Sequence, residues 1–492
     1  MKKLTPYVAA ILLIYCSSNE KISVTSDINK KFKIEDLKED YTVLQSALEE
    51  AHPGIYRYIT KEKFDALFDS LNSEIRSERT EIEFFRFISP IIAQIRCGHT
   101  SISLSHNYRN YMTKQNKYFP LQLKFISNKA YVLKSFSSNE IIPSGSEIIS
   151  INQKTISEII EMIFKMISSD GNIQTAKYRR LDEEFSELYC QCISPTDSFE
   201  IKYIPFGNNI VKDEVIPAKP WEEIKKYKSS YMARQKEPLK FEIMDNPVVA
   251  VMTIVTFIPR IIKNNYGDFY GFIDSTFTLL KEKNIKNLII DVRGNNGGDV
   301  HYFSTVLSKF IDKPYRIAER IDVPTPKYSF LKYTQHGFFF NFVNSLSYVK
   351  NEKTGRFDLK GKSGWHQLIN PQEPHFQGKI YMLMDGWSFS AASDFCAIAH
   401  SNAHDKITFI GEETGGAYYG NNSGDWIKLT LPNTQIQVNI PMRYYLLAVF
   451  DYPYYDRGVI PDLEVIPDIE DILNNKDTQL EFALNIIKQR NK

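Results

Sequence analysis

The pattern of apolar and polar positions separates two regions in the first half of the chain. Between residues 34 and 93, apolar residues recur at steps of three and four, which predicts helices that are interrupted at residues 52–54. Residues 121–126 and 131–136 alternate between apolar and polar side chains, which predicts strands. The first half is therefore expected to hold a helical N-terminal region and then a β-rich module.

The second half contains short runs that are apolar at almost every position, as fully buried strands are. These runs cover residues 248–254, 288–292 and 379–384. A stretch with helical periodicity at residues 268–283 lies between the first two runs, so strands and helices alternate. This order predicts an α/β core, and the long aromatic-rich stretch 300–376 between two of its strands predicts an inserted lid or subdomain.

Two of the predicted strands end in turns that can carry chemistry. The first turn contains Gly297 and Gly298, and paired glycines let main-chain N–H groups come close to a substrate. The other strand leads into a segment with three serines, Ser388, Ser390 and Ser393. Side by side, such turns can supply a nucleophile and the donors that stabilise an oxyanion.

Taken alone, each of these features has an ordinary structural explanation. A glycine pair after a strand is usually a tight turn, and a serine before a helix is usually an N-cap. A single histidine such as His99 is more often a polar turn residue than a catalytic one, and eight other histidines compete with it. Only the ordered occurrence of several motifs favours a catalytic site.

Five short motifs resemble, in the right order, those of the C-terminal processing (tail-specific) peptidases and their tricorn-core relatives. The motifs are Gly-His-Thr at 98–100, Asp-Val-Arg-Gly-Asn-Asn-Gly-Gly at 291–298, Ser-Ala-Ala-Ser-Asp at 390–394, Gly-Glu-Glu-Thr-Gly-Gly at 411–416 and Gly-Val-Ile-Pro-Asp at 458–462. The resemblance spans roughly residues 34–467. It implies an α/β fold with a helical N-terminal region, a PDZ-like β-rich module and a ClpP/crotonase-like catalytic core.

The resemblance and the patterns together predict the domain organisation. The expected units are an export signal and tether at 1–33, a helical N-terminal domain carrying His99 at 34–117, a PDZ-like module at 118–205, a linker at 206–246, an α/β catalytic domain at 247–467 with an insertion at 300–376, and a C-terminal helix at 468–492. In such peptidases a PDZ domain offers a sheet edge or groove to an extended peptide. The alternative here is a degenerate module that only packs on the core, because residues 168–192 fit the pattern poorly.

By this resemblance Ser390 is the nucleophile, because it directly precedes Ala391 as in the family motif. Ser388 and Ser393 are rival hydroxyls in the same segment. For the oxyanion hole we expect the main-chain N–H of Gly298, with Gly297 as its neighbour, and that of Ala391.

The family uses either a lysine or a histidine as the base. The lysine belongs to a Thr-x-Gly-Lys loop, which here ends in Gly416-Ala417, so a lysine base is not expected. His99 occupies the matching turn of the tricorn-like branch, and an imidazole can accept the hydroxyl proton and return it to the leaving amine.

A histidine base needs a partner that fixes its tautomer. The resemblance places an acid before the Gly-Val-x-Pro-Asp motif, which makes Asp456 the first choice and Asp451 the alternative. Three residues that flank His99 are further candidates for orienting it: Cys97, Thr100 and Ser101.

Composition bears on which partners, metals and cofactors can be expected. Sixty basic and fifty-nine acidic residues give a formal net charge of +1, so nothing points to nucleic acid. The five cysteines are too few for a disulfide framework in so long a chain, and Cys190-Gln191-Cys192 lacks a second cluster or a histidine pair. We expect no metal and no cofactor, and a polypeptide as the substrate.

The N-terminus reads as a bacterial export signal. Lys2 and Lys3 precede a short apolar stretch at residues 7–15, which ends at Cys16 and polar residues. The ending resembles a lipoprotein processing site, in which Cys16 becomes the lipidated first residue and anchors the protein to a membrane. An ordinary secretory signal is the alternative, because Tyr15 stands where a small residue is usual.

These observations predict an exported serine endopeptidase, periplasmic or on the cell surface. It would act on unfolded or extended polypeptides through Ser390, His99 and an aspartate. Two alternatives stay open: an inactive surface lipoprotein of the same fold that binds a peptide or another ligand, and an esterase. No Gly-x-Ser-x-Gly motif surrounds Ser390, which counts against the usual esterase scaffold.

Overall fold

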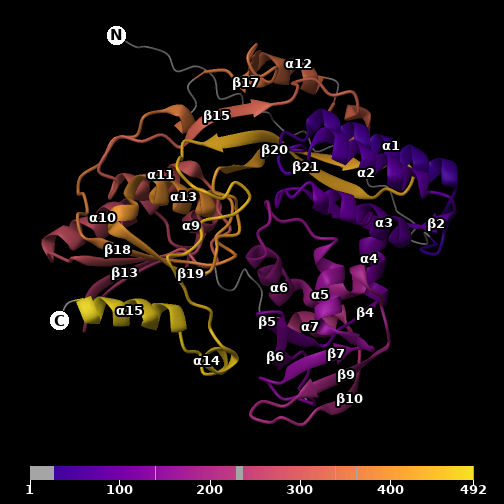
Figure 1. Cartoon of the computed structure of the whole chain (residues 1–492), viewed down its shortest axis with the longest axis horizontal. Coiled ribbons are helices and arrows are strands. Elements are labelled where there is room, and N and C mark those ends of the chain that lie inside the picture. Colours follow the sequence, from indigo (N-terminus) through magenta and orange to yellow (C-terminus); the bar gives the residue numbers. More distant parts are fainter. Residues whose placement is uncertain (1–26, 139, 229–236, 338, 362–363, 491–492) are drawn as a thin grey trace.

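The computed structural model describes residues 27–138, 140–228, 237–337, 339–361 and 364–490. Figure 1 shows an α/β core at the C-terminal end of the chain, a second sheet with N-terminal helices against it, and a small sheet with its own helices. This architecture confirms the predicted α/β fold class. Within the described residues, no helix has both the length and the apolar character needed to cross a bilayer.

The core sheet has the order β12-β13-β14-β18-β19-β22. β12 runs antiparallel to β13, and all other neighbours are parallel. Its strands are β12 (Leu239–Asp245), β13 (Val248–Ile254), β14 (Asn287–Asp291), β18 (Lys379–Met384), β19 (Ile407–Gly411) and β22 (Leu463–Glu464). Parallel strands buried on both faces are apolar almost throughout, which is why the sequence pattern located β13, β14 and β18.

Helices cover both faces of the core sheet. Met252, Ile290 and Met382 belong to a buried cluster with helices α10, α11 and α13, whereas their neighbours Ile289 and Tyr381 contact α15 on the other face. This alternation is the period of two that strand geometry dictates. The helices around the core are α9 (Pro259–Asn265), α10 (Phe269–Glu282), α11 (Val300–Ser308), α13 (Ala391–Ala403), η3 (His404–Lys406), α14 (Ile469–Leu473) and α15 (Thr478–Arg490).

The second sheet is antiparallel, with the order β16-β17-β15-β21-β20, and β3 pairs with β21. Its strands are β3 (Ser101–Ser103), β15 (Ala318–Val323), β16 (Tyr348–Lys350), β17 (Phe357–Leu359), β20 (Gly420–Thr430) and β21 (Gln437–Leu447). Three short helices lie between β15 and β18 in the chain: η1 (Leu331–Tyr333), α12 (Phe339–Leu346) and η2 (Gly364–His366).

The insertion predicted at residues 300–376 is therefore corrected in two respects. Its first residues form α11, which packs in the core against α13, because Phe303, Val306 and Leu307 are fully buried there. The following strands β15, β16 and β17 do not form a unit of their own, because they extend the second sheet alongside β21.

The N-terminal helices pack against the β20–β21 hairpin. Leu44 and Leu48 of the first helix share a buried cluster with Ile427 and Ile440 of the hairpin. A capping box formed by Thr80 and Glu83 starts the third helix. The elements of this region are β1 (Lys31–Phe32), α1 (Ile34–Ala51), α2 (Lys61–Ser73), β2 (Arg79–Thr80), α3 (Glu81–Gln94) and α4 (His106–Gln115).

The small sheet has the order β10-β9-β7-β6-β5, with β8 paired to β7. Its strands are β5 (Leu121–Ile126), β6 (Lys129–Ser135), β7 (Glu147–Ile151), β8 (Lys154–Thr155), β9 (Ser198–Ile204) and β10 (Lys212–Pro217). The helices α5 (Ile156–Phe164) and α6 (Thr175–Cys192) cover it with one apolar cluster. α6 lies along the edge strand β5, where Phe125 donates its N–H to Asp182 at 2.8 Å.

The segment 206–246, predicted as a linker, instead contains three strands and a helix in its described part. β10 belongs to the small sheet and β12 to the core sheet. Between them lie β11 (Lys219–Pro220), which pairs with β4 (Lys117–Tyr118), and α7 (Trp221–Tyr227).

Candidate active site

Ser390 stands at the turn between β18 and α13, as the N-cap of that helix. Its backbone has φ 54° and ψ −126°, a conformation that non-glycine residues rarely adopt. Strained residues of this kind persist only where the surroundings enforce them, and they cluster at active sites. The same strained strand-to-helix geometry holds the nucleophile of α/β-hydrolases, although the glycine motif of those enzymes is absent around Ser390.

The two rival serines have structural partners. The Ser388 hydroxyl donates to the Val292 carbonyl at 2.8 Å and accepts the Asp385 N–H at 3.1 Å. The Ser393 hydroxyl donates to the Ser390 carbonyl at 2.7 Å. Both hydroxyls thus hold the turn that presents Ser390.

His99 lies in the loop between α3 and β3 and reaches Ser390 across the domain boundary. Its Nε2 is 3.1 Å from the Ser390 Oγ, and its ring stacks on Phe389 with 4.6 Å between ring centroids. Burial lowers the pKa of His99, and the nearby carboxylate of Asp170 opposes this shift. The imidazole is therefore held neutral and in position to accept the hydroxyl proton.

The other ring nitrogen of His99 is not bonded to either predicted acid. Nδ1 is buried and has no hydrogen-bond partner in the described part of the chain. Asp456 instead accepts a hydrogen bond from the Asn172 side chain, and Asp451 is exposed. Neither Asp456 nor Asp451 therefore forms a hydrogen bond to Nδ1 of His99. The carboxylate of Asp456 points toward the loop at residues 170–172 instead.

Asp170 is a buried acid near His99 that the sequence motifs did not single out. It is 3% exposed, it accepts the Gly98 N–H at 2.6 Å, and its charge acts on His99. Its second oxygen faces the Ala417 N–H at 3.4 Å. Asp170 therefore fixes the turn that carries His99, and its charge acts on the imidazole without a direct hydrogen bond to it.

The residues that flank His99 are engaged elsewhere. Thr100 bonds through Oγ1 to the His52 ring at 2.8 Å, and the Ser101 hydroxyl accepts from Asn439 at 3.2 Å. Burial raises the pKa of Cys97 to about 11, so its thiol is protonated at neutral pH.

The glycine turn adjoins the nucleophile. A Cβ on Gly297 would lie 2.7 Å from the Ala391 nitrogen and 2.9 Å from the Ser390 Cβ, so only glycine fits there, at φ 92°. The turns are also joined by bonds from the Phe389 N–H to the Asn295 carbonyl and from the Gly294 N–H to Asp385, both 3.0 Å.

Two of the three predicted oxyanion donors, the N–H groups of Gly298 and Ala391, donate no hydrogen bond to another group in the described part of the chain. The Gly297 carbonyl accepts the Phe257 N–H at 3.0 Å, so the Gly298 N–H of the same trans peptide points the opposite way. Ala391 is the first residue of α13, so its N–H has no acceptor within the helix. The Gly297 N–H is a correction: it donates to Asn295 Oδ1 at 2.8 Å and is not free for an oxyanion.

Ala417 follows the 411–416 loop at the position of the lysine in the lysine-dependent branch of the family. At the position where the lysine would stand, Ala417 presents its main-chain N–H to Asp170. The loop is tied to the next motif by Glu413, which binds Arg457 at 2.7 and 2.8 Å and accepts the Gly458 N–H. Asp170 thus joins the histidine turn to the 411–417 segment, and Glu413 joins that segment to the motif at 458–462.

The predictions of no metal and of lipidation at Cys16 both stay predictions. In the described residues, no group of three or more histidine, cysteine or acidic side chains is placed to hold a metal ion. Cys97, Cys190, Cys192 and Cys396 are free and buried. Cys16 lies outside the described residues, so its lipidation stays a prediction.

The site thus combines a strained serine, a neutral histidine within hydrogen-bond distance and main-chain donors, which is the constellation of a serine hydrolase. Residues 249–465 match the model of peptidase family S41. The chain therefore carries an S41 peptidase domain, which confirms the predicted resemblance and the class of enzyme, a serine-type peptidase. No curated protein shows a significant match to the chain.

Solved structures of similar fold extend the likeness beyond this domain. A structure of mature CPAF complexed with lactacystin has a TM-score of 0.65 at 12% identity, over 93% of this chain and 98% of that one. A crystal structure of mature CPAF has a TM-score of 0.63 at 13% identity, over 92% and 97% of the two chains. At this identity the likeness shows a common fold across nearly the whole chain.

Proposed function

We propose that this protein is a serine endopeptidase in which Ser390 is the nucleophile and His99 the general base. The observation that carries the proposal is the distance of 3.1 Å between His99 Nε2 and the Ser390 Oγ, at a serine whose backbone is held at φ 54°. The S41 domain supports hydrolysis of a peptide bond as the reaction.

The proposed reaction has two halves. His99 takes the hydroxyl proton while the Ser390 oxygen bonds to the substrate carbonyl carbon, and the N–H groups of Gly298 and Ala391 receive the oxyanion. The carbon–nitrogen bond then breaks, and His99 returns the proton to the leaving amine. Water adds to the acyl-enzyme with His99 as the base again, which releases the acid product and restores Ser390.

Asp170 is our choice for the orienting acid, in place of Asp456. Its negative charge favours the imidazolium that forms during attack, and its bond to the Gly98 N–H holds the histidine turn. The unpartnered Nδ1 of His99 is the atom that this carboxylate would serve when the site tightens around a substrate.

The substrate class that we propose is an unfolded or extended polypeptide. A direct test compares the wild-type chain with Ser390→Ala on an unfolded protein such as casein and on a simple ester. We expect cleavage of casein by the wild type and none by the variant. Binding of casein without any turnover by the wild type, or turnover of the ester alone, would contradict the proposal.

Export and a lipid anchor on Cys16 also remain part of the proposal. They rest on the basic start, the short apolar stretch and the cysteine at its end. Fractionation of cells that express the wild type or Cys16→Ser tests this. We expect the wild type in the membrane fraction and the variant released from it, whereas an unchanged distribution would exclude lipidation at Cys16.

A further inference from the structure

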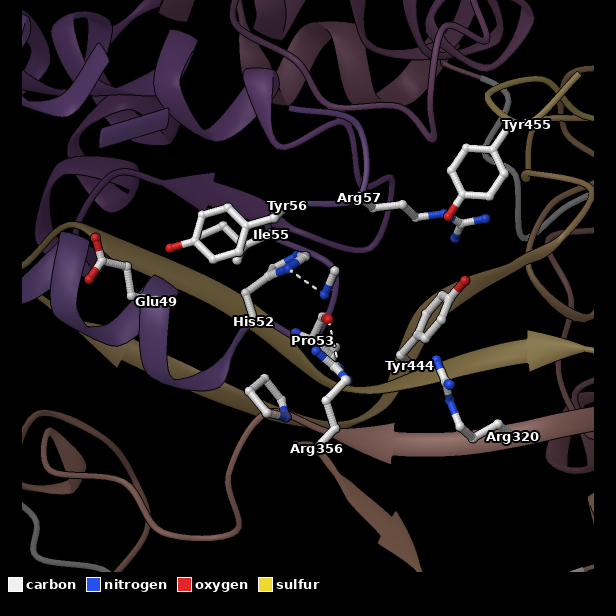
Figure 2. A pocket seen from close by; sticks show the side chains of 12 residues that line it. Glu49, His52, Pro53, Ile55, Tyr56, Arg57, Arg320, Arg356, Tyr444 and Tyr455 are labelled. Carbon is white, nitrogen blue, oxygen red and sulfur yellow. Dashed lines mark hydrogen bonds between the residues drawn. The ribbon is translucent and has the colours of Figure 1, made fainter. Parts of the chain in front are cut away.

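A pocket of about 260 Å³ lies where the N-terminal helices meet the second sheet, apart from Ser390 and His99 (Figure 2). Its walls come from the end of α1 and the loop at residues 52–57, from β15 and β21, and from Tyr455. Neither Ser390 nor His99 lines it. The pocket is distinguished by three arginines that reach it from different elements: Arg57, Arg320 and Arg356.

Two of the arginines share one buried carboxylate. Arg320 and Arg356 each approach Asp322 within 2.5 Å. The carboxylate has no exposed surface, whereas the side chains of Arg320 and Arg356 are 31% and 28% exposed. Asp322 therefore lies behind the two guanidinium groups, which keep surface toward the pocket and carry one positive charge more than their partner.

Arg57 adds a third positive charge. No direct ion pair joins it to a carboxylate in the described part of the chain, although the charge of Asp170 acts on it from outside the pocket. Its Nη1 donates to the Gly420 carbonyl at 2.7 Å, whereas Nε and Nη2 are buried without a hydrogen-bond partner among the described residues. The rings of Tyr58, Tyr444 and Tyr455 surround the guanidinium at 5.0 to 5.3 Å. The Nε–Nη2 edge of arginine is the fork that binds carboxylates in pairs of hydrogen bonds.

Glu49 is the acidic residue that lines the pocket, and it accepts a hydrogen bond from Gln45. Two further carboxylates act on the arginines from outside the lining: Asp322 on Arg320 and Arg356, and Asp170 on Arg57. His52 contributes no charge near neutral pH, because burial lowers its pKa to about 3. The lining itself therefore holds three guanidinium groups and one carboxylate, an excess of positive groups that is favourable for an anion.

The rest of the lining limits the kind of anion. Pro53, Ile55 and Pro324 add apolar side chains to the lining. The hydroxyl-bearing rings of Tyr444 and Tyr455 lie near Arg57 (Figure 2). The volume is below the range of about 300–1,000 Å³ that drug-sized ligands occupy. A carboxylate on a small apolar body matches both features better than a bare inorganic ion does.

We propose that this pocket binds a small apolar carboxylate, held by Arg320 and Arg356 and attracted by Arg57. The carboxylate belongs either to a free organic acid or to the C-terminal residue of a peptide. The site is separate from Ser390 and does not depend on the proposed peptidase mechanism.

The test measures binding by calorimetry at constant ionic strength, with the full chain carrying Ser390→Ala so that no turnover occurs. The probes are N-acetyl-leucine and its uncharged amide. We expect saturable binding of the acid and binding of the amide weaker by about 10-fold or more, the range expected for charged hydrogen bonds. Equal binding of the acid and the amide, or no binding of the acid, would overturn the proposal.

Variants of Arg320 locate the binding. Arg320→Gln should weaken the acid by about 10-fold or more, and Arg320→Lys, which keeps the charge but loses the fork, should fall between the two. Arg316→Gln is the matched control, because Arg316 is exposed and lies outside the pocket. A loss of binding in the control equal to that in Arg320→Gln, or unchanged binding in Arg320→Gln, would place the ligand elsewhere.

A final comparison separates the sources of the carboxylate. If a tripeptide ending in leucine binds as well as N-acetyl-leucine and its C-terminal amide does not, the pocket accepts a peptide terminus. If only N-acetyl-leucine binds, the ligand is a free acid. Binding of inorganic phosphate with no binding of either carboxylate would overturn the proposed ligand class.

Discussion

His99 Nε2 lies 3.1 Å from the hydroxyl oxygen of Ser390, although 291 positions separate the two residues. The histidine comes from the N-terminal helical region and the serine from the α/β core, so the pair exists only when these two parts pack together. The strand β3, two residues after His99, pairs with β21 and anchors the histidine turn to the second sheet. The folding of the whole chain is thus what assembles the site.

Asp170→Asn should reduce kcat by about 10²-fold or more, because the variant loses the negative charge that stabilises the imidazolium. Asp456→Asn is the matched control and should stay within about twofold of the wild type, since its carboxylate bonds to Asn172. Steady-state kinetics on an unstructured peptide check both variants. The opposite ranking would restore Asp456 as the acid.

The pH profile gives an independent measure of the same contact. Burial lowers the pKa of His99 below its ordinary value of 6.5, so the acidic limb of kcat/KM should have its midpoint below pH 6.5. Asp170 raises this pKa, so Asp170→Asn should move the limb to still lower pH. A limb that stays in place in Asp170→Asn, or moves to higher pH, would show that the carboxylate does not act on His99.

Gly297→Ala should abolish most activity, because its methyl group would press on the Ala391 nitrogen and on Ser390. Gly294→Ala is a control with a similar backbone cost, since Gly294 also has a positive φ but has open space where a Cβ would stand. We expect at least a ~10²-fold loss of kcat/KM for Gly297→Ala and a much smaller one for Gly294→Ala. Equal effects would mean that backbone strain alone matters.

Asp394 should make the stability of the protein depend on pH. Burial raises the pKa of Asp394 to about 8, while the Asn421 side chain donates to both of its oxygens at 3.0 and 3.1 Å. The folded state therefore holds a proton that the unfolded chain releases, and stability falls as pH rises from about 4 to about 8. Asp394→Asn should flatten this part of the curve of thermal midpoint against pH, and an unchanged slope would contradict the assignment.

The sequence predicts those parts of the fold whose cause is local. The apolar runs of β13, β14 and β18 mark fully buried strands, and the periodic stretch at 268–283 corresponds to α10 (Phe269–Glu282). The serine and histidine candidates also follow from short motifs, because each motif encodes a turn that its own residues form.

Asp170 shows why the rest of the site escapes such reasoning. Its position near His99 depends on the turns at Gly98 and Ala417, which both direct an N–H toward it although these segments are far apart in the chain. Its own segment fits the expected PDZ pattern poorly, and this misfit was the available signal. Asp456 does lie next to the segment that carries Asp170, since its carbonyl accepts the Asn172 N–H at 2.8 Å. The motif, however, does not determine the direction of its side chain.

Peptide binding by the predicted PDZ-like module stays a prediction. One main-chain N–H on its edge strand β5 is already bonded to a side chain of α6. The Phe125 N–H is bonded to Asp182, and Arg179 both pairs with Asp182 at 3.2 Å and approaches Glu412 of the core at 3.7 Å. A peptide that adds to β5 at this point has to displace Asp182.

The central claim, that His99 activates Ser390, is tested most directly by labelling with a fluorophosphonate and locating the adduct by mass spectrometry. We predict one adduct on Ser390 in the wild type, the same adduct in Ser393→Ala, whose hydroxyl only supports the turn, and at least a ~10²-fold slower reaction in His99→Ala. An adduct on another residue, or labelling of Ser390 at an unchanged rate without His99, would contradict the account.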